Sequence, residues 1–164
     1  MLPARIELLQ GMPIFGGVSE HALVFLLEQT RSVSVPAGQF YFREADDASG
    51  MFVLETGRVA VSKTWKGKEF VLRHLGPGDC FGEMALMDLQ LRSASIRAID
   101  DCSAIELAPA HLYALFKRDA EQFALIQMNM GREVCRRLRA TDELLFHAEM
   151  GALGNDPSRV SRTT

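Results

Sequence analysis

The feature of this sequence that most constrains its fold is a run of short segments, over residues 31–107, in which apolar side chains occupy alternate positions. Alternation with a period of two places the apolar side chains on one face of a β-strand. Turns that contain glycine separate the segments at intervals of about ten residues, which is typical of an antiparallel sandwich, jelly roll or small barrel. Because no strand alternates with a long helix in this region, the sequence excludes a doubly wound parallel sheet.

Helical spacing precedes and follows this β region. Residues 1–30 are expected to form helices, with Ser19 placed to cap the second one. One further helix is expected over Pro109 to Lys117, and a longer one from near Ala120 to about Glu149. A stripe on the long helix needs cover, either from the β region or from the same helix of a second chain. The stripe consists of Phe123, Ile126, Met130, Val134, Leu138, Thr141, Leu145 and Ala148.

These patterns predict one domain over residues 1–150, mainly β with flanking helices, followed by a disordered tail over residues 151–164. Within the domain, residues 1–30 are the N-terminal helices, residues 31–108 an antiparallel sandwich, jelly roll or small barrel, and residues 109–150 the C-terminal helices. A chain of 164 residues suits one domain with such appendages. The tail is predicted from its small and polar residues, which are rich in Gly, Ser and Thr.

The composition excludes several classes of protein. A formal net charge of -3 argues against a general nucleic-acid binder, which usually carries a basic excess. No apolar run approaches the roughly 20 residues that span a bilayer, and the first residues do not resemble a secretion signal. Cys80, Cys102 and Cys135 form no CxxC pair and have no histidine at zinc-ligand spacing. We therefore expect a cytoplasmic protein that holds no metal and binds no membrane.

Known catalytic motifs are also missing from the sequence. It contains no G-x-S-x-G elbow, no HExxH and no P-loop, and no cysteine lies in a motif associated with a nucleophile. A phosphodiesterase would need metal ligands that the sequence lacks. We therefore expect a protein that is not an enzyme and uses no cofactor. The residues after Met150 are too few and too polar for a helix-turn-helix, so a whole DNA-binding transcription factor is not expected.

The segment that carries chemistry is Phe81-Gly82-Glu83-Met84-Ala85-Leu86, followed after a short loop by Arg92-Ser93-Ala94. A strand that ends at a glycine and leads into a helical turn leaves backbone N–H groups without partners, and these attract a phosphate. Arg92 adds a guanidinium that can hold two phosphate oxygens, and Ser93 adds a hydroxyl. Glu83 would repel a phosphate, but its carboxylate can accept a hydrogen bond from a sugar hydroxyl beside the phosphate. These groups together predict a nucleotide site.

The same residues resemble the phosphate-binding cassette of the cyclic nucleotide-binding domain family. The family pattern, Phe-Gly-Glu-x-Ala-Leu followed by a short loop and Arg-Ser/Ala-Ala, is matched without a gap. The resemblance extends from Phe15 to Leu145 and includes Gly57-Arg58-Val59-Ala60-Val61 and Gly76-Pro77-Gly78-Asp79. Within the family, the chain is most similar to the ligand-binding half of the bacterial catabolite activators. The resemblance implies an eight-stranded jelly roll flanked by helices.

The resemblance also implies a role for each residue of the cassette. Glu83 is expected to accept the ribose 2′-hydroxyl of a cyclic nucleotide, and Arg92 to pair with its cyclic phosphate. Val61 and Leu72 match positions that line the apolar side of the pocket in relatives. The residues expected to contact phosphate and ribose are Gly82, Glu83, Met84, Ala85, Arg92, Ser93 and Ala94.

For the purine, the resemblance points to the long helix. Residues 135–143 resemble the dimer helix of the activators, and the expected contacts there are Arg137, Thr141 and Asp142. Thr141 falls where a threonine contacts the purine amino group. Asp142 replaces a serine that the partner subunit contributes in the activators, and a carboxylate there could accept from either guanine or adenine. A hydroxyl at the position of Ser93 meets guanine in cGMP-selective relatives. We expect cAMP in preference to cGMP.

We therefore expect a stand-alone receptor for a cyclic mononucleotide that forms a homodimer through its long helix. Binding is expected to shift a conformational equilibrium, closing the helix over the base and changing the surface offered to a downstream protein. Direct DNA binding is not expected, because acidic residues such as Glu133 and Glu143 surround the arginines of the long helix. Two alternatives remain open: a Glu83–Arg92 surface ion pair that binds nothing, and a ligand-independent dimeric interaction module with the same fold.

Overall fold

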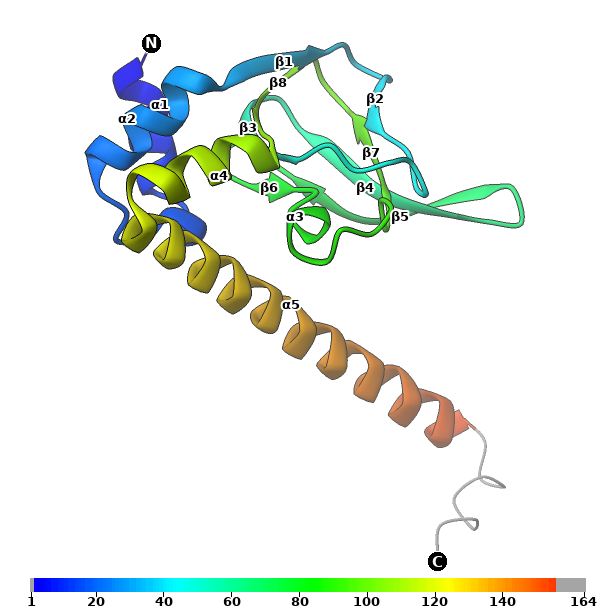
Figure 1. The fold of residues 1–164 in the computed structure, drawn as a ribbon. Coiled ribbons are helices and arrows are strands. Elements are labelled where there is room, and N and C mark those ends of the chain that lie inside the picture. The colour runs from blue at the N-terminus through cyan, green and yellow to red at the C-terminus, as the bar shows by residue number, and fades with distance from the viewer. Residues whose placement is uncertain (1, 156–164) are drawn as a thin grey trace, which may run out of the picture. The chain divides into compact units, whose positions relative to one another are not determined.

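The structure is a computed structural model that describes residues 2–155 (Figure 1). The chain divides into two compact units, one that ends at Asn129 and one that begins at Met130. The first unit contains α1 (Leu2–Gln10), the 3-10 helix η1 (Pro13–Phe15), α2 (Glu20–Gln29), α3 (Met84–Asp88) and α4 (Pro109–Arg118). Helix α5 (Ala120–Asn155) begins in the first unit and forms the described part of the second. Within the described residues, none of these helices is long and apolar enough to cross a membrane.

Eight antiparallel strands of the described chain form two four-stranded sheets, which confirms the predicted jelly roll with flanking helices. One sheet has the strand order β1-β8-β3-β6, and the other has the order β2-β7-β4-β5. Strands far apart in the sequence are neighbours in the sheets. Strand β1 pairs with β8, with Arg31 opposite Glu106 at one end and Val35 opposite Cys102 at the other. The strands are β1 (Arg31–Val35), β2 (Phe40–Phe42), β3 (Met51–Thr56), β4 (Val59–Trp65), β5 (Lys68–Leu75), β6 (Cys80–Phe81), β7 (Ser95–Ala98) and β8 (Cys102–Leu107).

Apolar side chains from both sheets form the core. Because burial of apolar surface contributes roughly 25 cal/mol per Å², this cluster is the main source of stability for the β region. The alternating pattern of the sequence supplies its members, since every second residue of a strand points to the same face. They are Val35, Phe52, Leu54, Val59, Val61, Leu75, Phe81, Ile96, Ala98, Cys102 and Ala104.

The β4–β5 hairpin projects from the rest of the β region, with its turn at Lys66 and Gly67 (Figure 1). Lys66 and Gly67 both have positive φ, 50° and 75°, as a tight two-residue turn between antiparallel strands requires. Trp65, the residue before the turn, is 64% exposed, and the Lys66 ammonium lies 4.4 Å from the centroid of its ring. Strand β5 is an edge strand whose residues are all exposed except Leu75.

Helix ends agree with the capping signals of the sequence. The Ser19 hydroxyl caps α2 by accepting a hydrogen bond from the Ala22 N–H at 3.2 Å, as predicted. Helix α5 continues past the predicted end near Glu149, so residues 151–155 of the predicted tail are helical. Gly151 and Gly154 each disfavour a helix by about 1 kcal/mol, much less than a proline does, so the helix continues through them. Residues 156–164, the remainder of the predicted disordered tail, lie outside the described residues.

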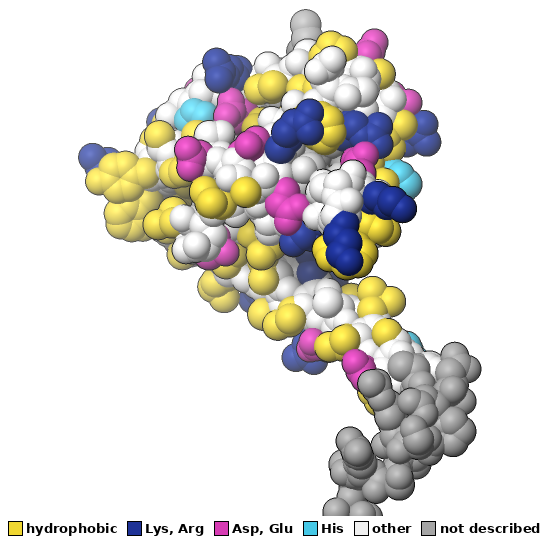
Figure 2. Space-filling view, turned by 90° about the vertical axis from the view of Figure 1, so that its right-hand side faces the viewer, with side chains coloured by type: hydrophobic (Ala, Val, Ile, Leu, Met, Phe, Trp, Pro, Cys, Tyr) yellow, Lys and Arg dark blue, Asp and Glu magenta, His cyan; other side chains and the backbone are white. Residues whose placement is uncertain are grey.

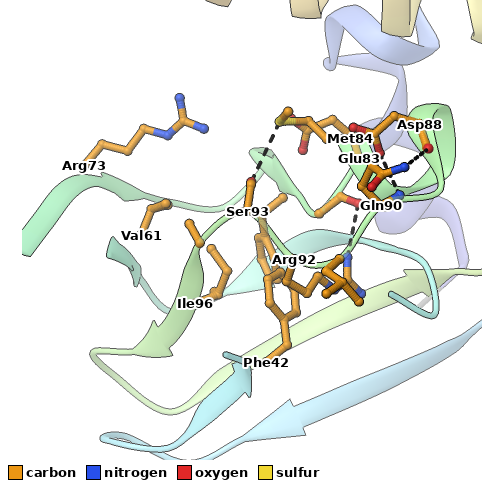
Figure 3. Close-up of a pocket in the computed structure, with 14 residues that line it drawn as sticks. Phe42, Val61, Arg73, Glu83, Met84, Asp88, Gln90, Arg92, Ser93 and Ile96 are labelled. Atoms are coloured by element: carbon orange, nitrogen blue, oxygen red, sulfur yellow. Dashed lines mark hydrogen bonds between the residues drawn. The ribbon is translucent and has the colours of Figure 1, made fainter. Parts of the chain in front are cut away.

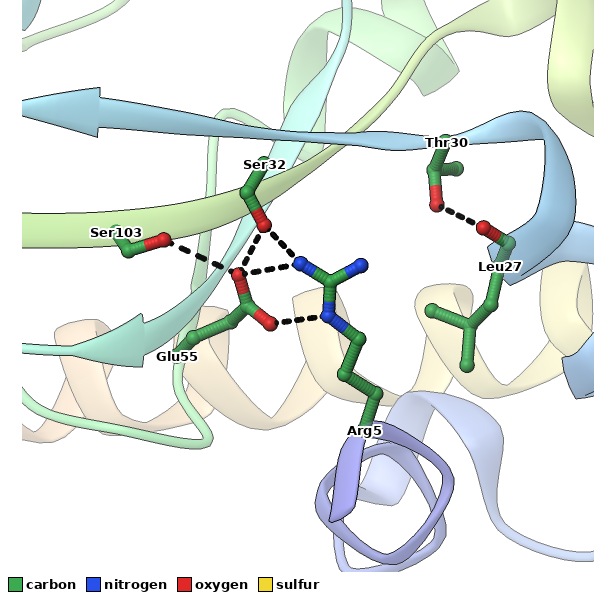
Figure 4. A network of polar contacts seen from close by, with 6 residues as sticks. All are labelled: Arg5, Leu27, Thr30, Ser32, Glu55 and Ser103. Atoms are coloured by element: carbon green, nitrogen blue, oxygen red, sulfur yellow. Dashed lines mark hydrogen bonds and ion pairs between the residues drawn. The ribbon is translucent and has the colours of Figure 1, made fainter. Parts of the chain in front are cut away.

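A polar network around Glu55 of β3 fastens α1 to the sheet β1-β8-β3-β6 (Figure 4). The Arg5 guanidinium donates to both carboxylate oxygens of Glu55, through Nε at 2.7 Å and Nη2 at 3.2 Å. Ser32 and Ser103 donate their hydroxyls to the Glu55 carboxylate, and Arg5 also donates to Ser32. The Arg5 and Glu55 side chains are 29% and 14% exposed, so this ion pair is less screened than one on the open surface.

Replacing Glu55 with glutamine should therefore loosen α1. We expect Glu55→Gln to lower the free energy of unfolding by about 1–2 kcal/mol, because the amide loses charge-assisted hydrogen bonds while Arg5 stays partly buried. Denaturant titration followed by far-ultraviolet circular dichroism measures this change. Asp100→Asn is the matched control, because it breaks an exposed ion pair with Arg58, whose side chains are 63% and 44% exposed. Equal effects of the two substitutions would contradict the assignment.

Candidate functional site

The floor of a cavity of about 130 Å³ is a row of residues that crosses the sheet β2-β7-β4-β5 (Figure 3). Phe42 of β2 is opposite Ile96 of β7, and Ile96 is opposite Val61 of β4. Val61 is in turn opposite Arg73 of β5. Neighbouring strands are about 4.8 Å apart, so the row measures roughly 14 Å between its terminal Cα atoms. The pocket thus has two ends, a Phe42 end and an Arg73 end.

The wall of the pocket begins at the turn that leads from β6 into α3. Gly82 has a φ of 77°, a conformation that residues with a side chain rarely adopt. A Cβ atom at this position would lie 2.5 Å from Nη1 of Arg92 and 3.2 Å from the carbonyl oxygen of Gly50. Glycine is therefore what allows the Arg92 side chain to lie against the turn.

Arg92 lies at the Phe42 end of the pocket and is only 5% exposed. Its guanidinium carbon is 3.9 Å from the centroid of the Phe42 ring, a cation–π contact, and its Nη1 donates to the Gly82 carbonyl at 3.2 Å. Its backbone is held as well, because its N–H donates to the Asp46 carbonyl at 2.9 Å and its carbonyl accepts from Ala45 N–H at 2.8 Å. These contacts hold the guanidinium in place.

The charge on Arg92 is incompletely compensated by the protein. Burial lowers the pKa of its guanidinium, and the carboxylates of Asp46, Glu106 and Glu83 oppose that shift. The group nevertheless stays protonated, as arginines in proteins do. Its Nε is buried and has no hydrogen-bond partner among the described residues. Because an unsatisfied buried donor is unfavourable, an anion that supplied an acceptor here would be stabilised.

Glu83 brings an acceptor to the same pocket. It connects Gly82 to α3 and is 3% exposed. An ionised carboxylate only accepts hydrogen bonds, whereas a guanidinium only donates them. A ligand that carries an anionic group beside a hydroxyl would be complementary in charge and hydrogen bonding to both residues. This combination of buried groups argues against the alternative of an exposed surface ion pair.

A cluster of aromatic rings supports the Phe42 end. The Phe52 and Phe81 rings stack with centroids 5.4 Å apart, and Tyr41 meets Phe81 edge-on at 5.1 Å. The Phe42 ring lies 6.0 Å from that of Phe52. Such rings pack rigidly in cores, so the surface on which the Arg92 guanidinium rests is fixed.

Most of the residues predicted for the site meet in this pocket. The cavity is lined by Val61, Gly82, Glu83, Met84, Arg92, Ser93 and Ala94, all predicted from the sequence. The Ser93 hydroxyl is exposed and donates to the Met84 sulfur at 3.9 Å. Ala85 is part of α3. Leu72 lies outside the lining and is 59% exposed.

A β-bulge explains the position of Leu72 and reveals a residue that the sequence analysis missed. The pairing of β4 with β5 places Arg73 opposite Val61 and Val71 opposite Ser62, so Leu72 is the extra residue. Arg73 consequently lies on the face that carries Leu75 and lines the pocket. A signal for it was present, because Arg73 is two positions from Leu75, and strand alternation places both on one face.

Three predicted purine contacts belong to the second unit of the chain. Thr141 donates its hydroxyl to the Arg137 carbonyl one turn earlier, at 2.9 Å. Arg137 Nε donates to Glu133 at 2.9 Å, and Arg136 forms an ion pair with the same carboxylate. Asp142 is exposed. These ion pairs fit the paired helix face expected from the sequence, and the contacts of Arg137, Thr141 and Asp142 with a purine stay a prediction.

Comparisons with known proteins agree with this geometry. The family model described as cyclic nucleotide-binding domain matches residues 32–119. A cyclic AMP receptor protein from Thermus thermophilus is 31% identical over 135 residues, which are 82% of this chain and 61% of that protein. The crystal structure of the Thermus thermophilus catabolite activator protein superposes with a TM-score of 0.74 at 30% identity, covering 84% of this chain and 63% of that one.

A second similar structure comes from Toxoplasma gondii. The regulatory domain of Toxoplasma gondii PKA, determined with cAMP, has a TM-score of 0.66 at 26% identity and covers 70% of this chain and 44% of that one. The chain therefore spans somewhat more than half the length of the bacterial relatives that it matches. The similarity concerns the part of those proteins that contains the pocket residues, because the matched family segment includes Val61 to Ala94.

The geometry of Gly82 predicts the effect of adding a single methyl group. We expect Gly67→Ala to lower the free energy of unfolding by about 1–2 kcal/mol, because Gly67 also has a positive φ, 75°, but has open space around its Cβ position. Gly82→Ala should lower the free energy of unfolding by about 1–3 kcal/mol more than Gly67→Ala does, since its methyl group also displaces Arg92 and clashes with the Gly50 carbonyl. Parallel denaturant titrations of the two variants measure the difference, and equal losses would show that the close approach of Arg92 is not needed for stability.

Proposed function

The chain belongs to the cyclic nucleotide-binding domain family, and on that premise we propose that it is a non-catalytic receptor for a cyclic purine mononucleotide. The observation that supports this most directly is the buried guanidinium of Arg92, whose Nε has no partner among the described residues. Beside it in the same pocket is the buried Glu83 carboxylate. The two groups complement a cyclic phosphate fused to a ribose, because this ligand has an anion and a neighbouring 2′-hydroxyl.

Each part of the ligand has a counterpart in the pocket under this proposal. Arg92 binds the cyclic phosphate with a fork of donors, assisted by backbone N–H groups of the segment from Gly82 to Ala85. Glu83 accepts the 2′-hydroxyl, which distinguishes a ribonucleotide from its deoxy form. Val61 and Ile96 provide an apolar floor between the two ends of the pocket for the sugar and base. The printed names of the Thermus and Toxoplasma proteins refer to cAMP, and by similarity alone cAMP is the favoured ligand.

A second cavity offers a route by which binding can affect the helices. It is lined by Leu86 of α3 together with apolar residues of α4 and of the start of α5, so it borders all three helices. Binding of the ligand to the segment from Gly82 to Ala85 would reposition α3 and thereby change its packing against Phe123 of α5. A ligand that prefers one arrangement shifts the population toward it, and the altered helix surface is what a downstream protein would recognise. The lining residues of this cavity are Leu86, Pro109, Leu112, Tyr113, Phe116, Phe123 and Gln127.

Calorimetric titration with cAMP and with cGMP tests the receptor proposal. The protein is first unfolded and refolded to remove any nucleotide that copurifies. We expect saturable binding at one site per chain, reduced by about 100-fold or more in Arg92→Ala and substantially in Arg92→Lys, which keeps the charge but loses the bidentate fork. Circular dichroism verifies that each variant is folded.

Arg58→Ala is the matched control for Arg92, because it removes an exposed guanidinium that pairs with Asp100 outside the pocket. It should bind as the unmodified protein does. The unmodified protein should bind the 2′-deoxy form of the nucleotide more weakly than the ribonucleotide. The Glu83→Gln variant should bind both forms with similar affinity. Absence of measurable binding of both cAMP and cGMP would reject the receptor proposal and favour the ligand-independent interaction module.

We also propose that α5 forms a homodimer. The later part of the stripe predicted on this helix is uncovered, because Leu138 and Leu145 are 59% and 60% exposed. Figure 2 shows hydrophobic side chains at the surface along this helix, between charged ones. Their spacing by three and four residues places them on one seam, as in a coiled coil. The same seam from a second chain is the surface that fits it best.

Disrupting the seam should convert the dimer into a monomer. We expect the double variant Leu138→Glu/Leu145→Glu to elute and sediment as a monomer, because four carboxylates would meet across a paired seam. Phe146→Glu is the control, since this exposed residue lies off the stripe and its substitution should leave the dimer intact. Sedimentation velocity measures all three proteins, and a monomeric unmodified protein at micromolar concentration would contradict the dimer.

A further inference from the structure

The β4–β5 hairpin presents large apolar side chains that the fold leaves in water. Trp65, Phe70, Val71 and Leu72 are 64%, 48%, 47% and 59% exposed. Single exposed apolar residues are ordinary on a protein surface, but a contiguous group of them marks an interaction surface. Trp65 and Phe70 line neither of the two cavities described above. The group is therefore a surface of the hairpin itself, separate from the nucleotide pocket.

One face of the hairpin tip, residues 63–70, combines aromatic rings with lysines. The strand pairing places Lys68 opposite Trp65 and Phe70 opposite Lys63. Residues directly opposite each other, and alternate residues of one strand, lie on the same face, so these four side chains share a face. Each aromatic residue thus has a lysine across the hairpin. Lys66 adds a third cation, because its ammonium lies 4.4 Å from the centroid of the Trp65 ring.

The opposite face of the tip has a different character. Its residues are polar, and the Ser62 hydroxyl donates to the Glu69 carboxylate at 2.7 Å. Arg97 of β7 forms an ion pair with the same carboxylate at 3.5 Å. The acidic residue of the tip is therefore engaged on the face that does not carry the aromatic rings.

The charge of the tip is opposite in sign to that of the whole chain. Residues 63–70 contain three lysines and one glutamate, a net charge of +2, whereas the chain has a net charge of -3. Lys63 pairs with Glu44 at 3.0 Å. Lys66 and Lys68 form no ion pair within the described residues. Two cations beside exposed rings fit a partner that is anionic and has an apolar layer next to its charges.

The shape of the tip argues against a protein or a nucleic acid as that partner. It projects from the β region and ends in a two-residue turn, so it is narrow and convex (Figure 1). Figure 2 views the side toward which the hairpin points, where basic side chains lie next to hydrophobic ones. A stable protein interface uses roughly 20–30 residues on each side, far more than this tip offers. Single-stranded nucleic acid needs a groove and open ring faces, and the Lys66 ammonium already lies over the Trp65 ring.

We propose that the tip of the β4–β5 hairpin binds an anionic lipid surface. Trp65 and Phe70 enter the boundary between head groups and acyl chains, where aromatic residues are favoured. The ammonium groups of Lys66 and Lys68 remain at the level of the lipid head groups and pair with their negative charges, while the apolar stems of both lysines lie beside the rings. This binding does not rest on the proposed receptor function.

The proposal reverses the expectation that the chain binds no membrane. That expectation followed from the lack of a spanning segment and of a secretion signal, neither of which peripheral binding requires. A narrow tip enters only the outer part of a bilayer, so binding is reversible and depends on both the rings and the cations. The two contributions can be removed separately.

Flotation with lipid vesicles tests the contribution of the rings. One set of vesicles contains phosphatidylcholine alone, and the other contains phosphatidylcholine and phosphatidylserine at about 3 to 1. We expect the protein to float with the anionic vesicles, less so as salt is raised, and only weakly with the neutral ones. Trp65→Ala should weaken binding by about 10-fold. Phe146→Ala is the control, because it removes an aromatic residue that is 56% exposed on α5 and should leave flotation unchanged.

A charge reversal tests the contribution of the cations. Lys68→Glu should weaken binding to the anionic vesicles by about 10-fold or more, since it exchanges an attraction to the surface for a repulsion. Lys117→Glu is the matched control, because it makes the same change in net charge at an exposed position of α4. It should change flotation little. Circular dichroism verifies that each variant is folded.

The outcomes that would overturn the proposal are specific. Flotation with neither kind of vesicle, or equal flotation of the unmodified protein, Trp65→Ala and Lys68→Glu, would reject it. Binding of a short single-stranded oligonucleotide that depends on Trp65, without vesicle binding, would assign the tip to nucleic acid instead. Trp65 and Lys68 lie outside the pocket lining, so neither substitution should alter the affinity for a cyclic nucleotide. Failure of the lipid proposal therefore leaves the receptor proposal intact.

Discussion

The contact between Arg92 and the Gly82 turn holds the pocket together. Arg92 is 5% exposed, so its guanidinium loses contact with water when the chain folds. A buried cation needs a defined set of protein partners to replace that water. The protein provides a carbonyl, the face of the Phe42 ring and carboxylates at longer range. The turn comes this close only because position 82 has no side chain. Glu83 follows directly in the chain, so the same turn that accommodates the cation also places the acceptor beside it.

Burial of the Arg92 guanidinium is unfavourable for the stability of the fold, and the same buried group is suited to bind an anion. Arg92 Nε is a buried donor without a partner among the described residues, and such a group is more favourable once an acceptor reaches it. Because the side chain is already held by Phe42, Gly82 and its own backbone contacts, little conformational freedom is left for a ligand to remove. A site of this kind binds an anion by completing the hydrogen bonds of a side chain that is already fixed in position, rather than by fixing a mobile side chain.

The parts of this structure that depend on local chemistry could be predicted from the sequence. Alternating apolar residues and glycine turns predicted the strands, and the segment from Phe81 to Ala94 predicted that Glu83 and Arg92 share one site. Burial of Arg92 against Phe42 could not be predicted, because the contact joins residues 50 positions apart through the pairing of β2 with β7. The exposure of Leu72 depends on a bulge that shifts the register by one residue, and no local composition marks it. The Arg5–Glu55 pair is likewise a long-range contact that charge patterning within one helix does not predict.

The exposed hairpin has an optical consequence. Trp65 is the single tryptophan of the chain, and it lies at the end of the hairpin that carries Arg73, in contact with Lys66 rather than with the core. Emission excited selectively in the indole therefore originates from this one hairpin and carries little information about the β-sandwich behind it. A spectral shift reports the surroundings of the β4–β5 tip, whereas the secondary structure is followed through the peptide absorption. The chain thus contains a natural, site-specific fluorophore on the hairpin that borders one end of its pocket.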